Sequence, residues 1–258
     1  MAKWTPFHHV GDYAFDATSV KKHWARLHTG DAEPCPKDAA VLQAWALFHS
    51  GDFEKAATAG LAAGGAGITV ANKATAIYAN YLEQKEKTRL DLFTQVAERA
   101  EAQAASDPEN ANAWYLHAYA IGRYGQGISV SKALAQGLGG KVKDSLEKAI
   151  ALSPKHADAR IALGAFHAEV IDKVGSLIGG MTYGAKKDTS LKLFQEALKL
   201  NPGSAIGMIE YANALVMLEG DKKMHEATVL YEKAAASEPA DAMERLDVEM
   251  ARAELEEE

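Results

Sequence analysis

The chain has 258 residues, of which 48% are hydrophobic, so it is long enough to bury a large apolar core. Its net charge is −7, of which residues 244–258 carry −5, and no basic stripe is present that could neutralise phosphates, which argues against nucleic-acid binding. A single cysteine, Cys35, excludes an intramolecular disulfide, and no stretch reads as a secretory signal or a membrane span, so we expect a cytoplasmic protein.

The N-terminal part of the chain is predicted to be an extension over residues 1–37. Its first 18 residues are irregular and rich in aromatic residues, and a short helix is expected from Ser19 to about His28, where a glycine turn ends it. A proline-rich connector follows at 31–37. Residues 38–258 are predicted to form a helical-repeat domain that starts with helices over 38–49 and 53–61, and the Gly-Gly-Ala-Gly stretch at 64–67 breaks the pattern.

The next elements are paired helices that end at proline-bearing junctions. One hairpin is expected from helices over 70–85 and 88–105, and later hairpins open near Asn112, Ala157 and Ala205. Prolines follow these runs at 108, 154, 202 and 239. Before three of these prolines, an alanine stands at a distance of five residues and a large apolar residue at eight: Ala149 and Leu146, Ala197 and Phe194, Ala234 and Tyr231.

This spacing is the register of a tetratricopeptide (TPR) repeat. The sequence therefore predicts an all-α fold, an αα-hairpin superhelix (a TPR-like solenoid) of about five hairpins with a C-terminal capping helix over roughly 240–256. The outer face of this capping helix is acidic. Its inner face is expected to seal the last hairpin through residues one helical turn apart, namely Met243, Leu246, Met250 and Ala253.

Two repeats carry long insertions. Successive prolines are 46, 48 and 37 residues apart, whereas the TPR repeat has 34, and the two long excesses both fall between the first and second helix of a hairpin. One possibility is that the insertions lengthen both helices of the hairpin. The other is that residues 126–140 and 171–185 form two flaps that close a groove. Because apolar side chains avoid water, at least partial burial is expected for those of the insertions: Ile128, Val130, Leu134, Leu138, Leu177, Ile178, Met181 and Tyr183.

The sequence holds no convincing catalytic or metal site. The loop that begins at Gly125 fails both phosphate-loop templates, and the nine histidines lack the spacing of a zinc site. His117 and His167 fall on successive first helices and are interpreted as groove or packing residues. Cys35 lies between two prolines without a partner base. We therefore expect a protein without enzymatic activity, cofactor or metal.

The inner face of the repeats is the candidate binding surface. In a TPR hairpin this face is built mainly from the first helix. In the third repeat of this chain, the first residue of this face is Asn112. It lacks the Lys/Asn/Asn/Lys/Arg clamp of co-chaperone TPR domains, and its mixed character suits an apolar or amphipathic ligand such as a helix or an acyl chain. The predicted groove-binding residues are Tyr115, Tyr119, Arg123, Asp158, Ile161, Glu169, Ile209, Asn213 and Met217.

Residues 110–240 resemble the TPR domain of the regulator of microtubule dynamics family. The resemblance runs from Trp114-Tyr115 through the segment that ends at Pro154, then through Leu163-Gly164 to the segment that ends at Pro202, and it includes the two long insertions. It implies an elongated TPR-like fold, protein tethering and, for one branch, phospholipid binding in the groove.

Two functions stay open from the sequence. The first is a non-enzymatic TPR scaffold or adaptor that binds a peptide or helix of a partner protein in its groove. The alternative is a carrier of a lipid or another apolar small molecule, in a groove closed by the two insertions. Burial of the apolar side chains of these insertions would favour the carrier.

Overall fold

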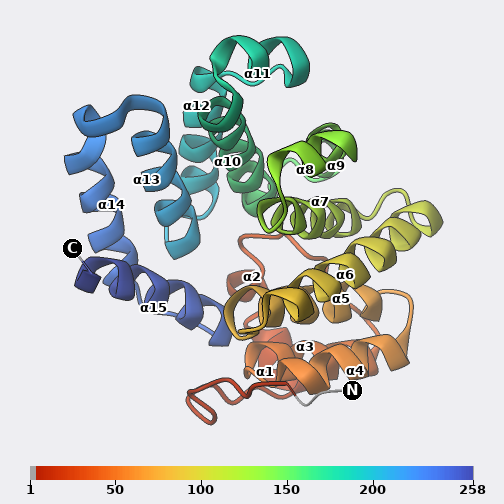
Figure 1. Cartoon of the computed structure of the whole chain (residues 1–258). Helices are drawn as coiled ribbons and strands as arrows, with labels where there is room; N and C mark the ends of the chain where they lie inside the picture. Colours follow the sequence, from red (N-terminus) through yellow and green to blue (C-terminus); the bar gives the residue numbers. More distant parts are fainter. Residues whose placement is uncertain (1–3, 258) are drawn as a thin grey trace. The chain divides into compact units, whose positions relative to one another are not determined.

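The computed structural model describes residues 4–257, and the regular secondary structure of this part of the chain is helical, without a strand (Figure 1). Residues 1–3 of the predicted extension and Glu258 of the acidic segment lie outside the described residues. The chain divides into two compact units. Unit 1 comprises residues 1–28, 33–152 and 241–243, and unit 2 comprises residues 29–32, 153–240 and 244–258.

The N-terminal segment of unit 1 packs its aromatic side chains around the first hairpin. The predicted helix from Ser19 to His28 is wrong in its bounds, because α1 spans Ala17–Lys22, α2 spans Trp24–Leu27, and the chain turns at His23 between them. Asp16 caps α1, since its side chain accepts a hydrogen bond from the Ser19 N–H at 2.7 Å.

The first hairpin consists of α3 (Ala39–His49) and α4 (Phe53–Ala63), close to the predicted bounds. The next consists of α5 (Gly67–Tyr81) and α6 (Glu86–Ser106). Gly60 in α4 and Gly67 at the start of α5 allow these two helices to pack closely, because a Cβ on either glycine would lie 2.5 Å from the carbonyl oxygen of the other. Only glycine lets the two backbones approach this closely.

The third hairpin pairs α7 (Ala111–Gln126) with α9 (Leu138–Leu152) and holds the first insertion. The insertion does not extend the two helices. It forms a separate short helix, α8 (Val130–Ala135), which Ser129 caps and which Gly137 ends with φ at +64°. Leu146 and Ala149 on α9 are buried, as the repeat register predicts.

Unit 2 opens with α10 (Ala157–Val174), which pairs with α12 (Lys187–Leu200). The second insertion forms α11 (Ser176–Tyr183) between two glycines of positive φ, Gly175 and Gly184. Phe194 and Ala197 are fully buried in the core of this hairpin. Two further helices follow, α13 (Ala205–Glu219) and α14 (Met224–Ala235), joined by the 3-10 helix η1 (Gly220–Lys223).

The capping helix is present as α15 (Ala242–Glu257), but its buried face differs from the predicted one. Leu246 is buried as expected, whereas Ala253 is exposed. Val248 and Ala251 instead pack with Ala205 and Ile209 of α13. The spacing of one helical turn between Met243 and Ala253 predicted a single buried stripe. The buried surface of α15 is instead shifted toward Val248 and Ala251.

Candidate functional site

Three of the predicted groove residues form one stripe along α7 in unit 1. Tyr115, Tyr119 and Arg123 are four residues apart and therefore share a face of the helix. The ring centroids of Tyr115 and Tyr119 are 6.1 Å apart, and the Arg123 guanidinium carbon lies 5.4 Å from the Tyr119 centroid. We call these three residues the α7 stripe.

Two contacts with other residues hold the middle of the α7 stripe and its Arg123 end. The Arg123 guanidinium donates a hydrogen bond to the Gln126 side-chain oxygen at 3.1 Å, and the Tyr119 ring lies 6.4 Å from the Phe93 ring on α6. All three stripe residues are half-buried. A cation over an aromatic face is attracted by the ring, and more strongly where water is partly excluded. The stripe therefore offers a preformed aromatic and cationic surface.

The predicted residues of α10 in unit 2 have different environments. Ile161 is buried in the apolar cluster around Phe194, which leaves its side chain little surface for a ligand. Glu169 is half-buried and forms an ion pair with Lys173 at 3.7 Å. Asp158 is half-buried at the start of the helix.

The first turn of α10 contacts Gly30, which is distant in sequence but belongs to the same unit. The Asp158 N–H donates a hydrogen bond to the Gly30 carbonyl at 3.0 Å, and a Cβ on Gly30 would collide with the Asp158 carboxylate. In unit 1, the equivalent residue of the third repeat, Asn112, donates a hydrogen bond to the Glu33 carboxylate at 2.6 Å. Gly30 therefore lies directly against Asp158 in unit 2, and Glu33 binds Asn112 in unit 1.

The predicted residues of α13 are likewise mixed. Ile209 is buried in the cluster that α13 shares with α14 and α15. Asn213 accepts a hydrogen bond from the Tyr231 hydroxyl of α14 at 2.7 Å, and Met217 is exposed. Of the nine predicted groove residues, the three of the α7 stripe are thus the ones that form a continuous set of side-chain contacts.

The opposite face of α7 lines a pocket that was not foreseen. At about 100° per residue, His117, Ile121 and Tyr124 lie on the side of the helix away from the α7 stripe. They form the floor of a cavity of about 220 Å³ between α6 and the α8–α9 segment. The other lining residues are Phe93, Thr94, Ala97, Glu98, Glu101, Gln136, Leu138 and Lys141.

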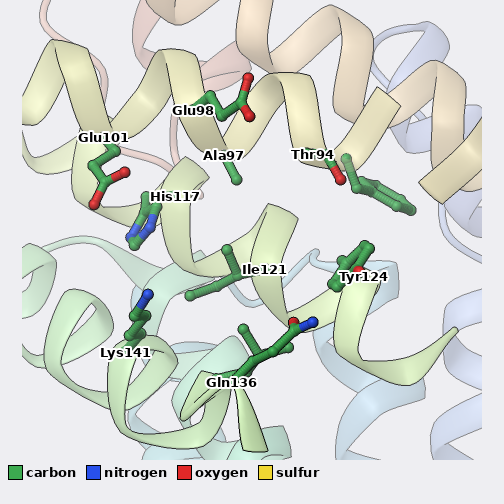
Figure 2. A pocket seen from close by; sticks show the side chains of 11 residues that line it. Thr94, Ala97, Glu98, Glu101, His117, Ile121, Tyr124, Gln136 and Lys141 are labelled. Carbon is green, nitrogen blue, oxygen red and sulfur yellow. The ribbon is translucent and has the colours of Figure 1, made fainter. Parts of the chain in front are cut away.

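The pocket has an apolar middle and a polar end. Figure 2 shows Ile121 in the middle, with Glu101, His117 and Lys141 gathered at one end and Tyr124 and Gln136 toward the other. His117 is held by a hydrogen bond between its Nδ1 and the Ser145 hydroxyl at 2.9 Å. Burial lowers the pKa of His117 and outweighs the nearby Glu101 carboxylate, while Lys141 lowers the pKa further.

Sequence reasoning missed this pocket because its walls come from three helices. His117 was predicted to be a groove or packing residue. The spacing of His117, Ile121 and Tyr124 places them on one face of the helix, and this pattern could have indicated a second lined surface. His167, in contrast, is buried in unit 2, where its Nδ1 accepts a hydrogen bond from the Lys186 N–H at 3.4 Å.

The expected burial of the insertion residues is wrong for most of them. Leu138 is buried, and Ile128 and Tyr183 are half-buried. Five others are exposed: Val130, Leu134, Leu177, Ile178 and Met181. The two insertions therefore present apolar side chains to solvent.

Residues 4–257 contain no group of three or more histidine, cysteine or acidic side chains placed to hold a metal ion. None of the helices in the described part of the chain is long and apolar enough to cross a membrane.

Comparisons with known proteins agree with this architecture. Residues 68–257 match the family profile of regulator of microtubule dynamics protein 1-3. A thermophilic TPR protein from Thermus thermophilus, TTC0263, has a similar solved structure, with a TM-score of 0.58 at 16% identity over 83% of this chain and 97% of that one. This likeness supports the TPR fold.

Two more distant structures were also found. YrrB, a TPR protein with an unusual peptide-binding site, gives a TM-score of 0.43 at 14% identity over 90% of this chain and 97% of that one. Human IFIT1, as a dimer with PPP-AAAA, gives 0.46 at 14% identity over 93% and 60%. A search of curated proteins found no match.

Proposed function

The chain belongs to the regulator of microtubule dynamics protein 1-3 family, and we propose that it is a non-enzymatic TPR scaffold that binds a peptide or helix of a partner protein. The observation that carries this proposal is the α7 stripe. Tyrosine and arginine are enriched in protein interfaces, and above all among the few residues that supply most of the binding energy.

The chemistry of the α7 stripe suits one class of ligand. The Tyr115 ring suits an apolar or proline side chain, and the Arg123 guanidinium, which lies over the Tyr119 ring, suits a carboxylate next to it. A peptide or helix that carries an apolar residue followed by an acidic one matches both parts. Because Arg123 is already positioned over Tyr119, little side-chain freedom is lost when such a peptide binds.

The alternative of an apolar carrier is not favoured by the insertions. A lid over a tunnel would turn its apolar side chains inward, but Leu177, Ile178 and Met181 are exposed to solvent. The apolar residues of α8 behave in the same way, because Val130 and Leu134 are also exposed.

Affinity purification of the full chain from its native cells would test the proposal. We expect a set of partners that is retained by wild-type protein and depleted about tenfold or more by Tyr119→Ala or Arg123→Ala. Tyr124→Ala is the matched control, because it removes a tyrosine from the opposite face of the same helix. If all three variants retain the same partners as wild type, the α7 stripe is not the binding surface.

A further inference from the structure

The pocket between α6 and the α8–α9 segment has a polar end whose two charged side chains are unpaired. Burial lowers the pKa of His117, the Glu101 carboxylate of α6 raises it and the Lys141 ammonium of α9 lowers it, so both charges lie close to the ring. Figure 2 shows the His117 ring between Glu101 and Lys141. In the part of the chain that the structure describes, neither of these two side chains forms an ion pair or a hydrogen bond. The polar end therefore offers an anion and a cation that have no partner in the protein.

The hydrogen bond of His117 defines what the ring offers to the pocket. Its Nδ1 lies 2.9 Å from the Ser145 hydroxyl of α9. Ser145 is buried, and its hydroxyl has no other partner among residues 4–257, so we assign it as the donor to Nδ1. Because burial disfavours the charged ring, the single ring proton is then on Nε2. His117 therefore adds a neutral N–H donor to the polar end.

The middle of the pocket is apolar and small. Ile121 of α7, Leu138 of α9 and Phe93 of α6 are all buried there. The cavity has a volume of about 220 Å³, below the range of about 300–1,000 Å³ that is usual for ligand pockets. It therefore suits a compact ligand with one short apolar group rather than a long chain.

We propose that this pocket binds a free α-amino acid with an apolar side chain. The ammonium group of the amino acid would pair with the Glu101 carboxylate, and its carboxylate would bind Lys141 and accept a hydrogen bond from His117 Nε2–H. Its side chain would cover Ile121 and Leu138. An α-amino acid carries both charges and an apolar group in one compact molecule, and these are the features that the pocket complements.

Ligands with a single charge fit the pocket less well. A fatty acid or another simple carboxylate would bring an anion to the wall of α6, which already carries Glu98 and Glu101. An amine without a carboxylate would bring a cation close to Lys141 and leave the His117 donor unused. In both cases the ligand faces a like charge that it cannot compensate, and such contacts oppose binding.

Isothermal titration calorimetry with the purified full chain would test the proposal. The probes are the free amino acids valine, leucine, isoleucine, methionine and phenylalanine. We expect at least one of them to bind with a Kd below about 1 mM. Its amide, which lacks the carboxylate, and its N-acetyl derivative, which lacks the ammonium group, should bind at least about tenfold more weakly. The proposal is wrong if none of the five binds, or if either derivative binds as tightly as the free amino acid. Tight binding of the N-acetyl derivative would indicate the C-terminus of a peptide instead.

Two variants assign the charges of the ligand to their partners. Glu101→Gln should weaken binding about tenfold and abolish the preference over the N-acetyl derivative, whereas Lys141→Gln should abolish the preference over the amide. Lys148→Gln is the control, because this lysine is exposed on α9 and does not line the pocket. Both pocket side chains are exposed, so the variants should fold with wild-type stability, which urea denaturation would check. Wild-type preferences in both pocket variants would overturn the proposal.

The outcome is separable from that for the α7 stripe. The pocket is on the opposite face of α7, and the titration uses the purified chain without a partner protein. Failure of amino-acid binding would therefore leave the proposed scaffold function untouched, and loss of partner binding in the stripe variants would leave the pocket proposal untouched.

Discussion

His49 and Asp241 form a buried pair that joins two distant parts of the chain within unit 1. The His49 Nδ1 lies 2.6 Å from an Asp241 carboxylate oxygen, and the exposed fractions of the two side chains are 1% and 2%. On the other side of the ring, His49 Nε2 lies 3.3 Å from His28 Nε2. Breaking such a pair leaves a polar group buried without its partner, which is costly.

We predict that Asp241→Ala lowers the free energy of unfolding by about 3 kcal/mol. Asp241→Asn should cost less, about 1 kcal/mol, because the amide oxygen can still accept a hydrogen bond from His49. Urea denaturation would measure both, with the exposed Asp221→Ala as the control, expected within about 0.5 kcal/mol of wild type. Equal effects of Asp241→Ala and Asp221→Ala would contradict a structural role for the pair.

Close packing between α10 and α12 leads to a second prediction. A Cβ on Gly164 would lie 2.9 Å from the Phe194 ring, which is fully buried and cannot easily move. Gly164→Ala should therefore destabilise the protein by about 1–3 kcal/mol, despite the better helix propensity of alanine. Thermal and urea unfolding would measure this loss.

Two variants separate the clash from other causes. Gly140→Ala also lies in a helix, but its Cβ would have no neighbour within 4 Å, so this variant should be neutral or slightly stabilising. In the Phe194→Leu background, the cost of Gly164→Ala should shrink, because the smaller side chain leaves room. A cost that is the same in both backgrounds would show that the ring is not responsible.

His117 predicts a pH dependence of stability. Burial lowers its pKa in the folded protein below the unfolded value of about 6.5, so the unfolded chain binds the proton more readily. The stabilising contribution of neutral His117 is therefore complete above about pH 6.5 and is lost as the pH falls through the lowered folded-state pKa. Wild type should lose more stability between about pH 7 and pH 5 than His117→Gln does.

Urea denaturation across this pH range would give the difference between the two proteins. His225→Gln is the control, because this histidine is exposed on α14. The prediction fails if the wild-type and His117→Gln profiles run parallel, or if His225→Gln changes the profile equally.

Leu177 and Met181 are exposed on α11, which predicts that these side chains matter little for stability. Leu177→Ser and Met181→Ser should each change the free energy of unfolding by less than about 0.5 kcal/mol, because these side chains bury little surface. Leu146→Ala, in contrast, should cost about 3 kcal/mol, since Leu146 is fully buried on α9. A cost for Met181→Ser close to that for Leu146→Ala would mean that the insertion is packed against the protein in solution.

The repeat architecture was predictable because it depends on local spacing. The alanine five residues before a proline, as at Ala149 and Ala197, must face its partner helix for the hairpin to close, and both are fully buried. The family resemblance inferred for residues 110–240 is confirmed by a match over residues 68–257.

Local spacing could not predict the structure of the two insertions. Their excess lengths of 12 and 14 residues are close to two heptads, so lengthened helices were a consistent interpretation. Gly137 and Gly184 decide the matter, because their positive φ angles end α8 and α11. A glycine in the sequence does not reveal which sign its φ will take.

Contacts between distant segments were also beyond sequence reasoning. Glu33 binds Asn112, and Gly30 binds Asp158, each across a sequence separation too large for any periodicity to report. In unit 2, Asp158 therefore lies directly against Gly30, and its role in ligand binding stays a prediction.

The most direct test of the central claim is the affinity of one partner peptide for two variants of α7. Isothermal titration calorimetry would compare Tyr119→Ala, on the α7 stripe, with Tyr124→Ala, on the pocket face of the same helix. The proposed function predicts a Kd about tenfold or more weaker for Tyr119→Ala and near the wild-type value for Tyr124→Ala. A wild-type Kd for Tyr119→Ala together with a weakened Kd for Tyr124→Ala would contradict it.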